Sequence, residues 1–297
     1  MRSARLRLAT RGSALALAQA SQVADVLGRA ELVVVSSDGE PGDKARFVRG
    51  VERALLEEAA DIGVHSAKDV PADMPNGLSI AAVPPREDPA DVWIGSGSRL
   101  EDVAEGARVG TASLRRRAQL LAARPDLRVS DLHGNVDTRL SRLAEGDLDA
   151  IVLAAAGLRR LGREAEASFA IPAETMTPAS GQGALLLQTR TGDEEAESEA
   201  AAIGDDAALM ELTAERAVVA LLEATCAAPI GVHARYDGEQ IAIEAFAGLP
   251  DGSEWIRDGL ETDGGEPALA GSLLAERLLG AGAREILDRA EEWLGRV

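Results

Sequence analysis

The stretch LRLATRGSALALAQASQVADVLGRAELVVVS, residues 6–36, contains the pattern that decides the fold. Residues 6–10 form a short, largely apolar run that is typical of a strand, and residues 12–30 place apolar side chains at helical spacing. Residues 31–36 form a second strand-like run. A strand, a helix and a strand over about 30 residues predict a βαβ unit whose strands are parallel.

The same alternation continues over the first two thirds of the chain. Further strand-like runs occur at DIGVHS (61–66), ARVGT (107–111), LRVSDL (127–132) and LDAIVLA (148–154), with helical patterns between them. This order predicts α/β units with helices on both faces of their sheets.

The last third of the chain has a different pattern. A helix within 209–224 is followed by three strand-like runs, at 230–236, 240–248 and 253–259, which turn signals separate. Two helical segments then finish the sequence. We expect a small α+β domain here, and we expect boundaries at the proline-rich VPPREDPAD (83–91) and at the acidic stretch 191–206.

The composition excludes several kinds of partner. The net charge of −19 argues against a polyanion, and 2% aromatic residues leave few platforms for stacking nucleic-acid bases. No run of about 18 apolar residues suggests a transmembrane helix. A single cysteine without an export-signal pattern indicates a reducing cytoplasm.

Of the 31 basic residues only Lys44 and Lys68 are lysines, which indicates either a salt-loving organism or GC-rich coding.

Arginine is concentrated in one zone of this acidic chain. Residues 108–128 contain six arginines, and three of them, Arg115 to Arg117, fall in the first turn of a predicted helix, where the helix dipole disfavours cations. A bound anion would offset that cost. The turns TRGS (10–13) and TAS (111–113) both lead from a strand into a helix, where exposed N–H groups suit an anion. Ordinary capping and an exposed basic face are the alternatives.

Two further segments of the sequence contain residues that suggest chemistry. Lys68 and Asp69 follow the strand-like run 61–66, and the carboxyl ends of strands are where α/β folds place their sites. A salt bridge within a loop is the alternative. Cys226, which cannot form an internal disulfide, is either a small buried residue or a nucleophile with a covalent attachment. The three histidines are widely spaced, so no metal site is expected.

Motifs in order along nearly the whole chain are similar to those of one enzyme family. They are RLATRGSALALAQA (7–20), FVRGVERALLEEAADIGVHSAKDVP (47–71), PPREDPADVWI (84–94), VGTASLRRRAQL (109–120), RPDLRVSDLHGNVDTRL (124–140), DAIVLAAAGLRRLG (149–162), PASGQGAL (178–185), ELTAERA (211–217) and CAAPIGVHA (226–234). In order and spacing the chain resembles hydroxymethylbilane synthase, also called porphobilinogen deaminase.

The resemblance implies a transferase of tetrapyrrole biosynthesis. Such an enzyme joins four porphobilinogen molecules head to tail into hydroxymethylbilane and releases ammonia. It carries a dipyrromethane cofactor through a thioether to one cysteine, which would be Cys226. Asp69 matches the catalytic aspartate, which would assist departure of the amine and stabilise positive charge on the pyrrole nitrogen.

The resemblance also assigns binding residues, because each pyrrole bears an acetate and a propionate. The cofactor-binding positions are Lys68, Ser66, Thr111, Ser113, Arg115 and Arg116. The substrate-binding positions are Arg11, Ser13, Arg139, Arg160, Gln182 and His133, with Lys44 and Phe47 from a loop over the site. Both lysines of the chain therefore fall on lysine positions of the family.

The sequence departs from the family pattern at three places. His133 stands where the family usually has an arginine, and histidine is shorter and only partly charged near neutral pH. The segment before KARFV (44–48) is shorter than the family's glycine-rich lid, and EAT (223–225) precedes the cysteine where glycines are common. These departures leave open a non-catalytic or impaired member that binds pyrrole carboxylates. An anion-binding protein without a tetrapyrrole, in which Cys226 is unmodified, is a weaker alternative.

We therefore predict an α/β protein of three domains. Two similar parallel or mixed-sheet units, like type II periplasmic binding proteins around a cleft, precede a small α+β domain with a three-stranded antiparallel sheet. The domains are residues 1–84 with 184–202, then 89–180, then 206–297, and the last carries Cys226. We expect a cytoplasmic monomer that acts on porphobilinogen and binds no nucleic acid, membrane or metal.

Overall fold

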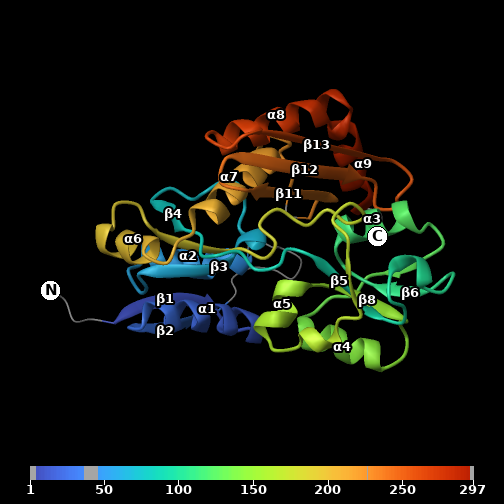
Figure 1. Ribbon diagram of the computed structural model, residues 1–297. Helices are drawn as coiled ribbons and strands as arrows, with labels where there is room; N and C mark the ends of the chain where they lie inside the picture. Colours follow the sequence, from blue (N-terminus) through green and yellow to red (C-terminus); the bar gives the residue numbers. More distant parts are fainter. Residues whose placement is uncertain (1–4, 37–45, 226, 295–297) are drawn as a thin grey trace. The chain divides into compact units, whose positions relative to one another are not determined.

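The computed structural model of the chain describes residues 5–36, 46–225 and 227–294. It divides into two units (Figure 1). Unit 1 comprises Met1–Glu87 and Gly183–Leu209, and unit 2 comprises Asp88–Gln182 and Met210–Val297. Unit 1 is therefore discontinuous in sequence.

Unit 1 is built on a five-stranded mixed sheet with the order β2-β1-β3-β10-β4. The strands are β1 (Leu6–Arg11), β2 (Ala30–Val35), β3 (Ile62–Ser66), β4 (Leu78–Ala82) and β10 (Leu185–Arg190). β1 runs parallel to β2 and to β3, whereas β10 is antiparallel to β3 and β4. The first βαβ unit of the sequence therefore forms as predicted.

Helices cover both faces of this sheet because side chains alternate along its strands. Leu8 of β1 packs with α1 (Ala14–Leu27) and α6 (Glu194–Ala201). Its neighbour Ala9 packs with α2 (Arg46–Leu56) on the opposite face. The short 3-10 helix η1 (Ala67–Asp69) follows β3 directly.

Unit 2 contains a second five-stranded sheet, with the order β7-β6-β8-β5-β9. The strands are β5 (Asp91–Gly95), β6 (Arg108–Gly110), β7 (Arg128–Ser130), β8 (Ala150–Ala154) and β9 (Phe169–Ile171). β6 is parallel to β7 and β8, and β5 is antiparallel to β8 and β9. The arrangement of parallel and antiparallel neighbours repeats that of unit 1.

Helices again lie on both faces of the second sheet. Leu120 of α3 (Leu114–Ala123) packs on one face with Val109 and Val152. The opposite face packs with α4 (Val136–Ala144) and α5 (Ala155–Arg160). The 3-10 helices are η2 (Leu100–Asp102) and η3 (Glu164–Glu166).

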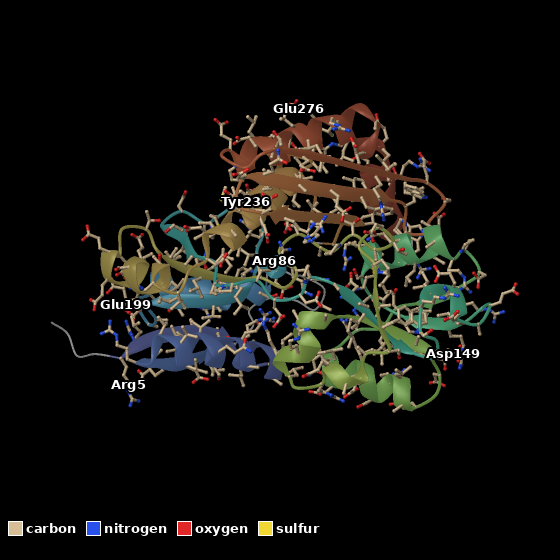
Figure 2. The ribbon with its side chains drawn as sticks, in the orientation of Figure 1. Arg5, Arg86, Asp149, Glu199, Tyr236 and Glu276 are labelled. Carbon is tan, nitrogen blue, oxygen red and sulfur yellow. The ribbon has the colours of Figure 1, made fainter. Side chains whose placement is uncertain are left out.

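The C-terminal part of unit 2 is a three-stranded antiparallel sheet packed on helices (Figure 1). Its strands are β11 (Ile230–Tyr236), β12 (Gln240–Gly248) and β13 (Trp255–Asp263), and the helices are α7 (Asp206–Leu221), which belongs to unit 2 from Met210 onward, α8 (Pro267–Gly280) and α9 (Ala283–Leu294). Their buried aliphatic side chains form one core. Acidic residues such as Glu276 of α8 lie on the outside (Figure 2).

The predicted fold class is confirmed: the chain has two similar mixed sheets and a small antiparallel sheet. The sequence did not reveal the antiparallel strands β5 and β10, nor β4 and β9 at the sheet edges. The three domain boundaries stay a prediction. Within the described residues, no helix has the length and apolar character needed to cross a membrane.

Candidate active site

In unit 1, polar side chains gather where two neighbouring parallel strands end. β1 ends at Arg11 and β3 ends at Ser66, and the two strands are hydrogen-bonded neighbours. Arg11 Nη2 lies 3.4 Å from Asp69 Oδ2, and the two side chains are 23% and 29% exposed. The structure therefore brings together two predicted site residues that are 58 positions apart in the sequence.

Local hydrogen bonds fix the turns that carry these residues. Ser13 is the N-cap of α1, and its hydroxyl accepts from Ala16 N at 3.3 Å. The backbone N–H of Ala67 donates to Ala184 O of the returning chain at 3.0 Å, which ties η1 to the start of β10. Ser66 and Lys68 flank Ala67 and are half-buried. The start of η1 is therefore anchored to the sheet.

His65 lies directly beneath the loop as the last fully buried residue of β3. Its Nε2 is 3.0 Å from Gln188 Oε1, and the ring is 4% exposed. Burial lowers the pKa of His65, the charge of Arg11 lowers it as well, and the Gln188 hydrogen bond opposes both, so that the resulting pKa is about 4. The imidazole is therefore neutral at physiological pH and donates its Nε2–H to Gln188.

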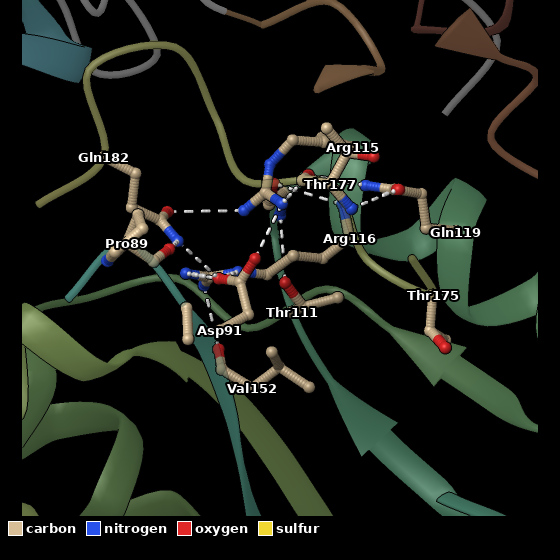
Figure 3. A network of polar contacts seen from close by, with 12 residues as sticks. Pro89, Asp91, Thr111, Arg115, Arg116, Gln119, Val152, Thr175, Thr177 and Gln182 are labelled. Carbon is tan, nitrogen blue, oxygen red and sulfur yellow. Dashed lines mark hydrogen bonds and ion pairs between the residues drawn. The ribbon is translucent and has the colours of Figure 1, made fainter. Parts of the chain in front are cut away.

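In unit 2, a buried carboxylate joins the two arginines that begin α3 (Figure 3). Arg115 Nη1 donates to Asp91 Oδ2 at 2.7 Å, and Arg116 Nε donates to Asp91 Oδ1 at 2.9 Å. Asp91 is fully buried, and the arginines are 4% and 5% exposed. Burial alone would raise the pKa of Asp91, but the two guanidinium charges and the hydrogen bonds hold it well below its usual range.

Two glutamines complete this network (Figure 3). Gln182 Nε2 donates to Asp91 Oδ1 at 3.1 Å and to Pro89 O at 2.6 Å, and its Oε1 faces Arg115 Nη2 at 3.4 Å. Gln119 makes paired hydrogen bonds with the backbone of Thr177, whose carbonyl also accepts from Arg115. The α3 terminus, β5 and the segment 175–182 are thus joined by hydrogen bonds that are mostly buried.

Arg139 of α4 adds a third positive charge to this region. Burial lowers its pKa to about 10, and repulsion by Arg116 contributes. Its buried Nε has no hydrogen-bond partner among the described residues. An unsatisfied buried guanidinium N–H next to another arginine is a ready donor for a carboxylate.

The other predicted residues of unit 2 lie on turns around the same sheet. Ser113 caps α3 by accepting from Arg116 N, and the buried Thr111 accepts from Ser113 N. Arg160 is half-buried in the last turn of α5. His133 is exposed on the turn between β7 and α4.

Three predicted site residues are described by the structure only in part or not at all. Lys44 and Cys226 lie outside the described residues, and only the backbone position of Phe47, in the first turn of α2, is described. The roles that the resemblance gives them stay predictions.

Sequence reasoning missed Asp91, the residue on which the arginine network centres. The only signal was an acidic residue at the start of an apolar run, DVWI (91–94), directly after the proline-rich crossing. A buried aspartate at the start of a strand requires cationic partners. Those partners lie 24 and 25 positions later in the chain.

Comparison with sequence families gives two matches that together span most of the chain. Residues 6–198 match the family described as "Porphobilinogen deaminase, dipyromethane cofactor binding domain". Residues 209–280 match "Porphobilinogen deaminase, C-terminal domain".

Curated relatives agree with these matches. A porphobilinogen deaminase of Campylobacter concisus is 45% identical over 84% of this chain and 82% of its own length. Those of Thiobacillus denitrificans and Syntrophus aciditrophicus are each 40% identical, over 95% and 97% of this chain and 98% and 99% of their own. Among solved structures, a nutrient binding protein from Burkholderia cenocepacia is 13% identical over 66% of this chain and 90% of its own, with a TM-score of 0.41.

Proposed function

The chain belongs to the porphobilinogen deaminase family, and we propose that the arginine cluster of unit 2 binds carboxylates of the cofactor and that Asp69 of unit 1 is the catalytic carboxylate. The chain is a transferase that polymerises four porphobilinogen molecules into hydroxymethylbilane and releases ammonia. The relatives give no support to a non-catalytic member.

The residues of unit 2 suit the dipyrromethane cofactor of the family. Its acetate and propionate groups are anions, and the Arg115, Arg116 and Arg139 cluster holds three positive charges against the one negative charge of Asp91. The buried Nε of Arg139 has no partner in the described chain and suits such a carboxylate. When bound, the cofactor supplies the pyrrole terminus to which porphobilinogen is added. We assign its covalent attachment to Cys226.

Asp69 is proposed as the catalytic carboxylate. It is partly exposed at the carboxyl end of β3, and Arg11 at the end of β1 holds one of its oxygens. A carboxylate fixed beside a developing positive charge stabilises the transition state without reorganising. Asp69 would also accept a proton released from the pyrrole that reacts. The Arg11–Asp69 pair is the observation that carries this assignment.

The remaining assignments follow from the family motif. We propose cofactor binding by Lys68, Ser66, Thr111 and Ser113, and substrate binding by Arg11, Ser13, Arg139, Arg160, Gln182, His133, Lys44 and Phe47. We further propose three domains, residues 1–84 with 184–202, 89–180 and 206–297, in a cytoplasmic monomer.

The experiment that tests the catalytic assignment compares Asp69→Asn with Asp73→Asn. Asp73 is an exposed aspartate on the same loop, so its variant controls for loss of a surface charge. We expect kcat for porphobilinogen consumption to fall by roughly a hundred- to ten-thousandfold in Asp69→Asn, as for loss of a group that transfers protons. Asp73→Asn should keep the wild-type rate.

The intact mass of each protein shows whether the cofactor is attached, and it therefore separates a catalytic defect from a failure to load the cofactor. A folded, cofactor-loaded Asp69→Asn with near wild-type kcat would contradict the role of Asp69. A folded, loaded wild-type protein that consumes no porphobilinogen would instead favour the non-catalytic member.

A further inference from the structure

The two arginines that bind Asp91 differ in how many of their guanidinium nitrogens already have an acceptor within the protein. All three nitrogens of the Arg116 guanidinium are engaged within the protein: Nε and Nη2 lie 2.9 and 2.8 Å from Asp91 Oδ1, and Nη1 donates to Val152 O at 2.9 Å. Arg116 is therefore turned inward, onto the sheet.

Arg115 is held differently. Its Nη1 donates to both Asp91 Oδ2 and Thr177 O at 2.7 Å, while its Nη2 has only a long contact of 3.4 Å, to Gln182. Within the described part of the chain, its Nε donates to no acceptor. One edge of the guanidinium is thus anchored, and the rest is left for another acceptor.

The charges of this cluster do not balance. Asp91 neutralises one of the two arginines that it touches, and Arg139 stands beside Arg116 as a further cation. Without Asp91, two buried guanidinium groups would repel each other and lose their common acceptor. The carboxylate therefore fixes the arginines in place and still leaves the cluster positive.

We propose that Asp91 is a positioning residue for cofactor loading. It holds Arg116 against the sheet, where the positive charge attracts the anionic cofactor, and it fixes Arg115 so that its Nε and Nη2 can bind a carboxylate of the dipyrromethane. This inference rests on the proposed function, because it assumes that the cluster receives that cofactor. Asp91 would touch neither cofactor nor substrate, and would act only through the two arginines.

The test measures cofactor loading rather than turnover. Protein produced without porphobilinogen is incubated with preformed hydroxymethylbilane, and intact mass follows the fraction that gains the mass of this bilane less one water, which leaves as the thioether forms. We expect Asp91→Asn to load roughly ten- to hundredfold more slowly than wild type, because a misplaced binding group loses most of its advantage. Asp91→Glu, which keeps the charge, should recover part of the rate.

Asp61→Asn is the matched control. Asp61 is also a carboxylate between two arginines, with Arg7 Nη2 at 2.6 Å and Arg190 Nη2 at 3.8 Å, but it lies at the opposite end of the strands from Arg11 and Asp69. Its loss should lower stability and leave loading at the wild-type rate. Slow loading that follows from general destabilisation would appear in both variants and would overturn the proposal.

A second variant decides the question if Asp91→Asn does not fold. Gln182→Met removes the amide that holds Asp91 Oδ1 and faces Arg115, and it keeps every charge of the cluster. Slower loading in folded Gln182→Met, with an unchanged KM for porphobilinogen once loaded, supports the proposal, and wild-type loading overturns it. If wild type itself fails to load, the proposed function is wrong, which is a distinct result.

Discussion

His65 shows how one buried residue makes unit 1 sensitive to acid. Its pKa is about 4 in the folded chain, against 6.5 for an unperturbed histidine. Between these values the unfolded chain binds a proton that the folded chain does not, so unfolding becomes easier as the pH falls. The neighbouring Glu52 acts in the opposite direction, because burial raises its pKa.

Replacing His65 should remove this acid sensitivity. Across the window from about pH 6.5 down to about pH 4, we expect the histidine to cost the wild-type protein about 3 kcal/mol of unfolding free energy, at about 1.4 kcal/mol per pKa unit. Urea unfolding of His65→Gln should show a shallower decline over that window. Glu52 is present in both proteins, so its contribution largely cancels in the comparison.

The control is His133→Gln, because His133 is exposed. Its unfolding free energy should follow the wild-type pH dependence. If the unfolding free energy of His65→Gln declined with falling pH as steeply as that of the wild-type protein, the buried imidazole would not have the lowered pKa that this account gives it.

The site residues were predictable to different extents. Asp69 and Lys68 stood out because they follow a strand and fall in a motif, and the Arg11–Asp69 ion pair follows from two neighbouring parallel strands. Asp91 did not stand out. Its role depends on a chain of contacts with Arg115, Arg116 and Gln182, and no local pattern encodes partners so distant in sequence.

At the scale of elements, periodicity identified six strands of the two mixed sheets and all three strands of the antiparallel sheet, and it missed β4, β5, β9 and β10. β1 and β3 are separated by helices and read as repeated strand–helix units. β5 and β10 instead pair with strands far from them in sequence, at Ala150–Ala154 and Ile62–Ser66. A local sequence pattern does not reveal pairing with partners so distant, nor the direction of that pairing.

Gly231 of β11 marks a close approach between two elements of unit 2. A Cβ there would lie 2.5 Å from Thr177 O and 3.1 Å from Pro178 O. A hydrogen bond joins the same strand to residues 177–178: Val232 N donates to Pro178 O at 2.8 Å. We expect Gly231→Ala to lower the unfolding free energy by about 1–3 kcal/mol, as overpacking does.

Gly280→Ala provides the comparison for this prediction. Gly280 ends α8, and no atom lies within 4 Å of the position that its Cβ would take. Its replacement should be neutral or slightly stabilising. Equal unfolding midpoints in urea for the two variants would contradict the tight contact at Gly231.

At the scale of the whole molecule, negative charge dominates the surface. The net charge is −19, and acidic residues such as Glu276 of α8 are exposed at the surface (Figure 2). Like charges repel in the compact state, and the repulsion weakens as ions screen it. The positive arginine cluster around Asp91 is buried and is screened less.

Salt should therefore stabilise the protein. Raising KCl from about 0.1 M to about 1 M shortens the screening length from about 10 Å to about 3 Å, and we expect the thermal unfolding midpoint to rise by several degrees. Scanning calorimetry of the cofactor-loaded protein at the two salt concentrations measures this. A midpoint that falls would mean that attractive ion pairs, rather than repulsion, dominate the surface.

We propose that Cys226 anchors the dipyrromethane on which hydroxymethylbilane is built, and the intact mass of the purified protein measures this attachment. The wild-type protein should carry the added mass of two linked pyrrole units, and Cys226→Ser should not. A wild-type protein that keeps its bare polypeptide mass after incubation with porphobilinogen or preformed hydroxymethylbilane would contradict the claim.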